Sequence, residues 1–177
     1  RGFTSLQNLF LIDGFRLNNS VFRPGPNQYW NTVDPYSIDR LELVRGPGSV
    51  LYGSDAIGGT VNAITFSPLD HGAGLMDGRL LYRGSTAERS HIGRGEAYGV
   101  VDEWFGYSLG FSGKHFGDLQ GGHAVGRQED TGYDEYDIDV KFEFQIDPET
   151  RLTAAYQRVR QNNVPRTHKT IHGIDWE

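Results

Sequence analysis

The chain has 177 residues, a formal net charge of −6, 24 glycines and no cysteine. The acidic balance argues against a nucleic-acid partner, because neutralising phosphates requires a basic face. The lack of cysteine excludes a disulfide framework and a thiolate metal site. No apolar run approaches the ~20 residues of a transmembrane helix, although this does not exclude strands that cross a membrane with alternating hydrophobicity.

The first predicted element is a β-hairpin. Residues 9–12 form a short apolar run that ends in Asp13-Gly14, a dipeptide suited to a tight turn. Strand-like alternation resumes over residues 15–17. We therefore expect two short antiparallel strands joined at Asp13-Gly14.

A loop is predicted over residues 18–34, which contain two prolines and few aliphatic residues. Aromatic and cationic groups lie in or just after it, at Arg23, Tyr29, Trp30 and Tyr36. One interpretation is that these aromatics attach the loop to the core. The other is that the four residues contact a ligand, since binding residues favour loops on a rigid scaffold.

Residues 38–65 are the most informative stretch, because glycines divide them into short apolar clusters. A short strand is predicted at residues 41–44, and a second cluster at residues 61–64 is long enough for another. A phosphate-binding loop would need a Gly-Lys-Ser/Thr sequence, and the stretch contains no lysine. A dinucleotide fingerprint would need a third glycine after Gly46 and Gly48, and a flexible linker would be more polar.

The residues of this stretch resemble the plug-domain signature of TonB-dependent outer-membrane receptors. The resemblance rests on Arg45, Gly46, Pro47, Tyr52, Gly53, Gly58, Gly59 and Asn62. The family's Arg-Gly-Phe and Ile-Asp-Gly elements are similar to residues 1–3 and 12–14, so we expect the chain to begin inside a plug domain. The ordered, glycine-rich match is more specific than any single short motif.

Beyond residues 68–74, a predicted linker of Pro, Asp, His and Gly, the chain changes character. Period-two alternation predicts strands over residues 75–83, 89–101, 104–116, 135–146 and 151–161. The strand at 135–146 is the clearest, with aromatic and aliphatic residues on one face and charged residues on the other.

Two environments explain such strands equally well. A soluble antiparallel sheet with one buried face gives this alternation, and so does a membrane barrel with lipid outside and water inside. The connections favour the barrel, because residues 102–103 and 147–150 form tight turns whereas residues 117–134 form a long loop. We expect the tight turns to be periplasmic and the long loop to be extracellular.

No catalytic constellation is evident in the sequence. The histidines lack a coherent ligand spacing, and the aspartates at positions 134, 137 and 139 lack the glycine and terminal glutamate of a calcium loop. We therefore expect neither an enzyme nor a metal site, and no cofactor.

The resemblance implies a mainly β fold: an α+β plug domain over residues 1–67, a linker, and the first strands of a large, incomplete transmembrane β-barrel over residues 75–177. It implies a receptor in the outer membrane of a Gram-negative-type bacterium that takes up a scarce solute, such as a ferric siderophore, haem or cobalamin. The implied partners are outer-membrane lipid and a TonB-type inner-membrane energy-coupling complex. The alternative is a soluble β-rich ligand-binding or adhesion domain without transport.

A final expectation concerns the seam between plug and barrel. Glu42 and Arg45 lie three residues apart in the signature stretch. A charge buried without a partner costs several kcal/mol, so we expect both to pair with charges of the barrel wall. If lumen water surrounds them instead, each pair would contribute ~1 kcal/mol or less.

Overall fold

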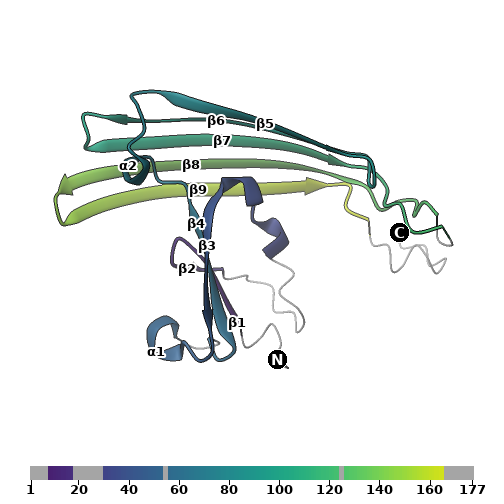
Figure 1. Ribbon diagram of the computed structural model, residues 1–177, viewed down its shortest axis with the longest axis horizontal. Coiled ribbons are helices and arrows are strands. Elements are labelled where there is room, and N and C mark those ends of the chain that lie inside the picture. The colour runs from purple at the N-terminus through teal and green to yellow at the C-terminus, as the bar shows by residue number, and fades with distance from the viewer. Residues whose placement is uncertain (1–7, 18–29, 54–55, 124–125, 166–177) are drawn as a thin grey trace. The chain divides into compact units, whose positions relative to one another are not determined.

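The computed structural model describes residues 8–17, 30–53, 56–123 and 126–165. The chain divides into two compact units, Arg1–Phe66 and Ser67–Glu177, each with its own sheet. Strands dominate both units, which confirms the expected mainly β fold (Figure 1). Among the described residues, no helix has the length and apolar character needed to cross a membrane.

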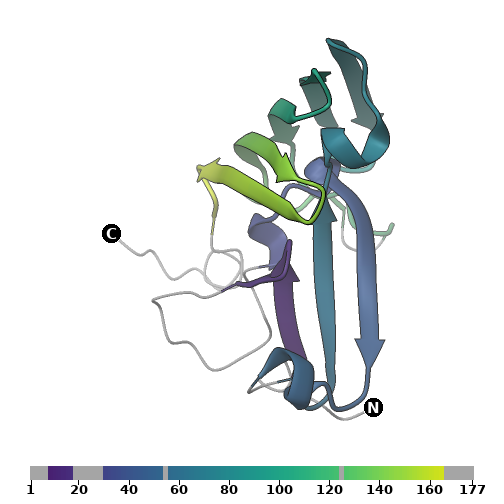
Figure 2. The same ribbon diagram turned by 90° about the vertical axis from the view of Figure 1, so that its left-hand side faces the viewer.

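The first unit contains a four-stranded sheet in the order β2-β1-β4-β3. Its strands are β1 (Asn8–Ile12), β2 (Phe15–Arg16), β3 (Ile38–Arg45) and β4 (Gly59–Thr65). Strand β4 runs parallel to β1 and antiparallel to β3 (Figure 2). Strand β3 is longer than the predicted strand at 41–44, because its pairing with β4 begins at Ile38 opposite Thr65.

Short helical turns complete the described part of this unit. They are η2 (Trp30–Thr32), η3 (Pro35–Ser37) and α1 (Ser49–Tyr52). The core is small and aliphatic: Leu9 and Leu11 on β1 are each 3% exposed, and Ala56 before β4 is fully buried against them. The parallel pairing of β1 with β4 therefore organises the core.

The predicted hairpin between β1 and β2 is confirmed. Asp13 and Gly14 both have positive φ, 49° and 81°, as a two-residue turn of the primed type requires. The Asp13 carboxylate also accepts hydrogen bonds from the Thr65 amide at 2.8 Å and the Thr65 hydroxyl at 2.6 Å. The turn is thereby fixed to the end of β4.

The second unit is a five-stranded antiparallel meander in the order β5-β6-β7-β8-β9. Its strands are β5 (Asp77–Ser85), β6 (Ser90–Val101), β7 (Phe105–Phe116), β8 (Tyr133–Asp147) and β9 (Thr150–Asn162). All five predicted strands are confirmed, with ends that shift by a few residues. Tight turns join β6 to β7 and β8 to β9 at one end of the sheet, and the longer loop 117–132 lies at the other (Figure 1).

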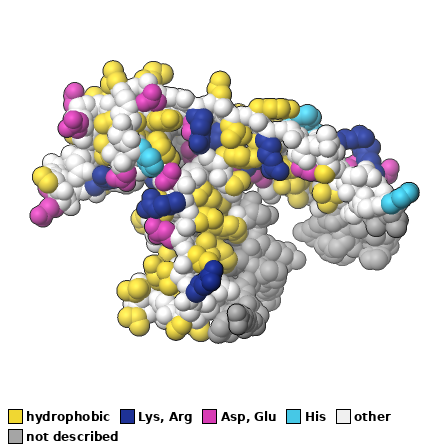
Figure 3. Space-filling view, viewed as in Figure 1, with side chains coloured by type: hydrophobic (Ala, Val, Ile, Leu, Met, Phe, Trp, Pro, Cys, Tyr) yellow, Lys and Arg dark blue, Asp and Glu magenta, His cyan; other side chains and the backbone are white. Residues whose placement is uncertain are grey.

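The two faces of this sheet differ in chemistry, as the alternation predicted. The apolar face carries exposed hydrophobic side chains, including Leu80, Tyr82, Leu109, Phe111, Tyr136, Ile138, Phe142, Leu152 and Tyr156. The polar face carries Arg79, Arg94, Glu96, Ser112, Lys114, Glu135, Asp137 and Asp139. In the space-filling view, hydrophobic side chains lie along the strands of this sheet, and Lys and Arg side chains lie between them (Figure 3).

A short helix, α2 (Pro68–His71), lies within the segment predicted as a linker. The Ser67 hydroxyl caps it by accepting a hydrogen bond from the Asp70 amide at 3.3 Å. Gly72 ends it in the left-handed conformation at φ 59°. Residues 68–71 are therefore ordered structure that packs against β6 and β7.

Candidate functional site

The glycine-rich signature forms the connection between β3 and β4. Gly46, at φ 99°, donates its amide to the Gly58 carbonyl at 3.2 Å, and Gly48 donates to the Ala56 carbonyl at 2.7 Å. These bonds close a compact loop that contains α1. Gly53, which ends α1, has φ 85°, a conformation that side chains with a Cβ rarely adopt.

Gly59 serves a different purpose, the close approach of two strands. It lies opposite Arg45, and a Cβ at this position would come within 2.9 Å of the Val44 carbonyl oxygen. A larger residue would push β3 away from β4. Backbone conformation thus explains the glycines at positions 46 and 53, and backbone contact explains the one at 59.

Asn62 links the signature to the hairpin and to β3. Its Oδ1 accepts a hydrogen bond from the Gly14 amide at 3.0 Å, and its Nδ2 donates to Glu42 Oε2 at 3.3 Å. The Asn62 side chain on β4 therefore contacts the turn after β1 on one side and a carboxylate of β3 on the other. This explains why the signature ends in an asparagine.

The residues predicted to pair across the seam lie on β3. Glu42 already contacts Arg40 Nε at 3.3 Å as well as Asn62. Arg45 ends β3, and its side chain is exposed. Pairing of Glu42 and Arg45 with barrel charges stays a prediction.

The predicted ligand residues are only partly described. Arg23 and Tyr29 lie outside the described residues. Trp30 begins η2, and its ring contacts Phe10 of β1 with centroids 5.1 Å apart. Tyr36 lies in η3, where Asp34 caps the turn by accepting from its amide at 3.2 Å. The Trp30 contact is the packing role considered above, and ligand binding stays a prediction for all four.

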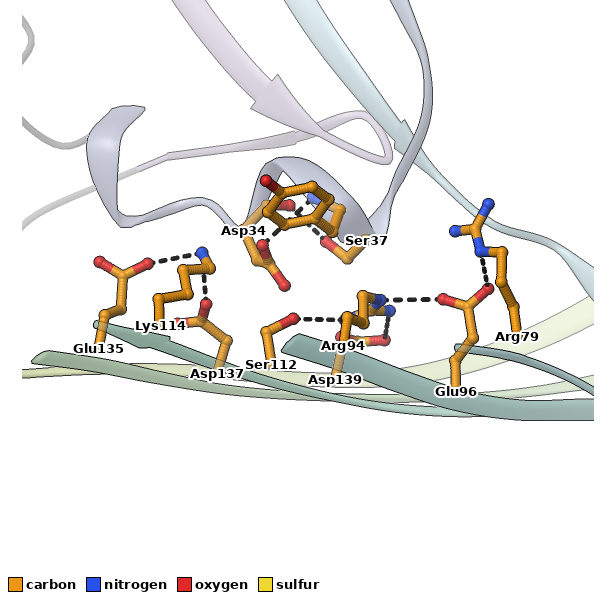
Figure 4. Close-up of polar contacts among 11 residues, drawn as sticks. Asp34, Ser37, Arg79, Arg94, Glu96, Ser112, Lys114, Glu135, Asp137 and Asp139 are labelled. Atoms are coloured by element: carbon orange, nitrogen blue, oxygen red, sulfur yellow. Dashed lines mark hydrogen bonds and ion pairs between the residues drawn. The ribbon is translucent and has the colours of Figure 1, made fainter. Parts of the chain in front are cut away.

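A ladder of ion pairs crosses the polar face (Figure 4). Lys114 Nζ on β7 lies 2.6 Å from Glu135 Oε1 and 2.6 Å from Asp137 Oδ2, both on β8. Gln161 on β9 donates to the second Glu135 oxygen at 2.5 Å. All three charged side chains are more than nine-tenths buried. One lysine therefore neutralises part of the charge of two carboxylates.

A second group in the ladder centres on Arg94 of β6. Its guanidinium binds Asp139 through two hydrogen bonds, at 2.7 and 3.1 Å, and Glu96 at 2.9 Å. It also donates to the Ser112 hydroxyl at 3.2 Å. Arg79 of β5 extends the group by contacting Glu96 at 2.8 Å. The planar fork of arginine suits this multiple recognition, which a lysine could not reproduce.

Helix α2 is attached to the polar face near the tight-turn end. The Ser67 hydroxyl donates to Glu143 Oε2 at 2.8 Å, and Arg151 Nη1 lies 2.7 Å from Asp70 Oδ1. The hydrogen bond from Arg151 holds the pKa of the Asp70 carboxyl below its ordinary value. The start of the second unit is thereby fixed to β8 and β9.

Sequence reasoning missed this attachment, although a signal was present. Ser67-Pro68-Leu69-Asp70 has the N-cap residue, the proline at the first helical position and the acidic third residue of a helix start. The partners Glu143 and Arg151 could not be found, because they lie 76 and 81 residues away from Ser67 and Asp70. Within the described ranges, no group of three His, Asp or Glu side chains is placed to hold a metal ion.

Comparisons with known proteins agree with these features. Residues 1–60 match the family described as TonB-dependent Receptor Plug Domain. The vitamin B12 transporter BtuB of Vibrio vulnificus is 46% identical over 67 residues, and the match covers 38% of this chain and 10% of the transporter. An iron-regulated outer membrane virulence protein of Vibrio cholerae is 46% identical over 69 residues, covering 37% of this chain and 11% of that protein.

Solved structures resemble the chain over most of its length. The ferric enterobactin receptor PfeA of Pseudomonas aeruginosa, in a mutant form bound to enterobactin, aligns with 94% of this chain at a TM-score of 0.65 and 21% identity. The siderophore receptor PirA of the same organism aligns with 92% at a TM-score of 0.60 and 23% identity. This chain covers 28% of each receptor. At such identities the likeness shows the fold.

The plug signature, the two-faced antiparallel sheet and these likenesses therefore agree. They also place the protein in the outer membrane of a Gram-negative-type bacterium. Residues 1–60 therefore belong to the plug-domain family of TonB-dependent receptors, and the five strands that follow have the fold of the matching receptor structures.

Proposed function

We propose that this chain acts in the TonB-dependent uptake of a scarce small solute, such as a ferric siderophore, haem or cobalamin, across the outer membrane. The observation that carries the proposal is a plug sheet and a two-faced strand meander in one chain. The relatives named as a vitamin B12 transporter and as siderophore receptors support the solute class. A soluble binding domain would have no use for so many exposed hydrophobic side chains along its strands.

Energy coupling to a TonB-type inner-membrane complex is part of the same proposal. In this mechanism the barrel stays fixed while the plug is rearranged. The contacts that stabilise the plug must therefore differ from those that stabilise the barrel. The polar face is suited to a wet lumen, because its charges are already neutralised by their neighbours on adjacent strands. A solute that moves along this polar face would therefore not have to separate apolar side chains packed against one another.

Uptake by whole cells tests the function. The full-length receptor would be expressed in cells that lack their own receptors, and accumulation of labelled ferric siderophore, haem or cobalamin would be measured. We expect accumulation of one solute class, abolished in cells without TonB but with surface binding retained. Binding and accumulation that are absent for all three classes would contradict the proposal, as would uptake that persists without TonB.

The proposed solute contacts are Arg23, Tyr29, Trp30 and Tyr36, which combine stacking surfaces with a cation. We expect the Tyr29→Ala/Trp30→Ala variant to bind its solute at least about tenfold more weakly, or about 1.4 kcal/mol. Because Trp30 also packs on Phe10, Trp30→Phe is the matched control that keeps a ring at this position. Unchanged affinity in the double variant would assign these aromatics to loop packing alone.

The orientation of the sheet can be tested on intact cells. Cysteines introduced singly at Gly121 and Glu149 of the full-length receptor would be exposed to a membrane-impermeant thiol reagent. We expect labelling at position 121, in the longer loop, and none at position 149, in a tight turn. The reverse pattern would overturn the orientation.

A further inference from the structure

The basic residues of the barrel strands are divided unevenly between the two faces. Most of them lie on the polar face, namely Arg79, Arg83, Arg94, Lys114, Lys141 and Arg151. Arg158 and Arg160 of β9 lie instead on the apolar face, because they stand directly opposite Ile138 and Tyr136 of β8. Within strands β5 to β9, Arg158 and Arg160 are the two basic residues that lie on the apolar face.

Their surroundings on the described strands leave the two arginines without an acidic partner. Arg160 Nε donates to Asn162 Oδ1 at 3.2 Å, and no described carboxylate pairs with Arg158. Asp134, the acidic residue at the end of this face, lies 2.7 Å from His115 Nδ1. Both arginine side chains are exposed. The apolar face therefore presents two adjacent positive charges.

The membrane limits where such charges can lie. An arginine on the lipid side of a barrel costs roughly 2–4 kcal/mol at the midplane and about 0–1 kcal/mol near the interface. Arg160 lies two residues before the end of β9. The next residues on the same face toward that end of the sheet are polar, namely His115, Asp134 and Asn162. The neighbouring Tyr136 and Tyr156 are residues typical of the membrane interface. This position favours headgroup depth for the two arginines, at the end of the sheet that carries loop 117–132.

We propose that Arg158 and Arg160 form a binding site for the phosphate group of an outer-leaflet lipid, whose acyl chains lie along the apolar face. Guanidinium groups bind phosphate through paired charge-assisted hydrogen bonds. Residues two apart on one face of a strand are about 6.6 Å apart, so both can reach one headgroup. The proposal rests on the outer-membrane placement of the chain and on the proposed extracellular position of loop 117–132, and it does not depend on which solute is taken up.

Retention of defined lipids by the full-length receptor tests the site. The receptor would be placed in phosphatidylcholine nanodiscs containing a small fraction of either bisphosphorylated lipid A or the same glycolipid without its phosphates. Bound glycolipid would be counted by native mass spectrometry. We expect about tenfold or greater preference for the phosphorylated form, lost in Arg158→Gln/Arg160→Gln. Excess inorganic phosphate should not displace the lipid, because it lacks the acyl chains.

The matched control is Arg79→Gln/Arg83→Gln, which removes the same charge from the polar face of β5. This variant should keep the preference. Equal retention of both glycolipids by the unaltered receptor would overturn the proposal, as would equal loss in both double variants. If Arg158→Gln/Arg160→Gln fails to give a heat-modifiable, folded barrel, Arg158→Lys/Arg160→Lys replaces it. Because lysine lacks the guanidinium fork, unchanged retention in that variant would also overturn the proposed paired contacts.

Discussion

The plug sheet and the barrel strands bury opposite kinds of side chain. In the plug, Leu9 and Leu11 are each 3% exposed and form the core. In the barrel strands, Leu80 is 90% exposed, whereas the side chain of Lys114 is 3% exposed and that of Asp137 is 2% exposed. Both regions use period-two strands, so the period itself does not determine which face is buried.

The surroundings of each region explain this difference. The plug sheet folds in water and gains stability by removing aliphatic side chains from it. The barrel strands face hydrocarbon on one side, where an exposed leucine is in a favourable solvent and needs no partner. Their other face holds charges, which must be neutralised by one another. Stability in this region therefore depends on the geometry of ion pairs.

The largest effect should come from breaking the ladder at Lys114. In Lys114→Met, two buried carboxylates, Glu135 and Asp137, would lose their shared cation. Removing one partner of a buried pair costs roughly 3–5 kcal/mol, and we expect that loss in the unfolding free energy of the barrel. Urea unfolding of the full-length receptor in detergent measures it.

Lys114→Met/Asp137→Leu is the comparison that separates charge from packing. If uncompensated charge causes the loss, removing one carboxylate together with the lysine should recover part of it. A double variant less stable than Lys114→Met would mean that shape, not charge, dominates at this position. The polar face would then resemble the plug core in its energetics.

A second prediction compares glycines in the two regions. Gly59→Ala would place a Cβ 2.9 Å from the Val44 carbonyl oxygen and force β3 away from β4. We expect the plug to lose about 1–3 kcal/mol, as overpacked sites do. Gly93→Ala on β6 is the matched control, because nothing lies within 4 Å of its Cβ and its φ is not positive. Hydrogen exchange of the β3 and β4 amides in the full-length receptor reports the difference, and equal effects would contradict it.

The barrel strands could be predicted from sequence because lipid and lumen impose alternation residue by residue. In β8, each residue from Glu135 to Phe144 faces the side that its polarity indicates. Local turn chemistry was equally informative at Asp13-Gly14. In both cases the information lies within a few residues of the chain.

What could not be predicted depends on contacts between distant residues. The parallel pairing of β1 with β4 joins segments about fifty residues apart, and nothing local to either strand specifies it. The partners in the ladder depend on register: Lys114 stands opposite Glu135, while Arg94 reaches Asp139 across the intervening strand β7. The signature glycines were recognisable as a motif, but the reason for Gly59 emerged only with the position of Val44.

A third prediction uses a turn that both regions contain. Asp102 and Glu103 have positive φ, 47° and 60°, as do Asp13 and Gly14 in the plug. Only the plug turn has glycine at the second position, where it relieves a strain of roughly 1–2 kcal/mol. Glu103→Gly should therefore stabilise the barrel by about 0.5–1 kcal/mol, since the added chain entropy of glycine offsets part of the gain. A lower unfolding midpoint in urea would contradict this assignment of strain.

The smallest expected effect concerns a carboxylate outside the strands, at Asp118 in loop 117–132. Its Oδ2 accepts two hydrogen bonds from Arg127, and its Oδ1 accepts from the amides of Thr131 and Gly132 at 3.1 and 3.2 Å. The Arg127 hydrogen bonds, followed by those amides, hold the pKa of Asp118 below its ordinary value of 3.8. In contrast to the buried ladder, this pair is open to water, so its loss should loosen the loop and leave the barrel folded.

The sign of the pH dependence follows from that lowered pKa. The contribution of Asp118 is fully present above its unfolded value of 3.8, and it is lost as the pH falls through the lower folded value. Hydrogen exchange of the Thr131 and Gly132 amides, corrected for intrinsic rates, should show steady protection from pH 7 to 5 and a loss only below 3.8. In Asp118→Asn, which cannot titrate, that step should be absent. If the same step persists in the variant, another acid controls the loop, and the contrast between exposed and buried pairs must then be drawn at a different residue.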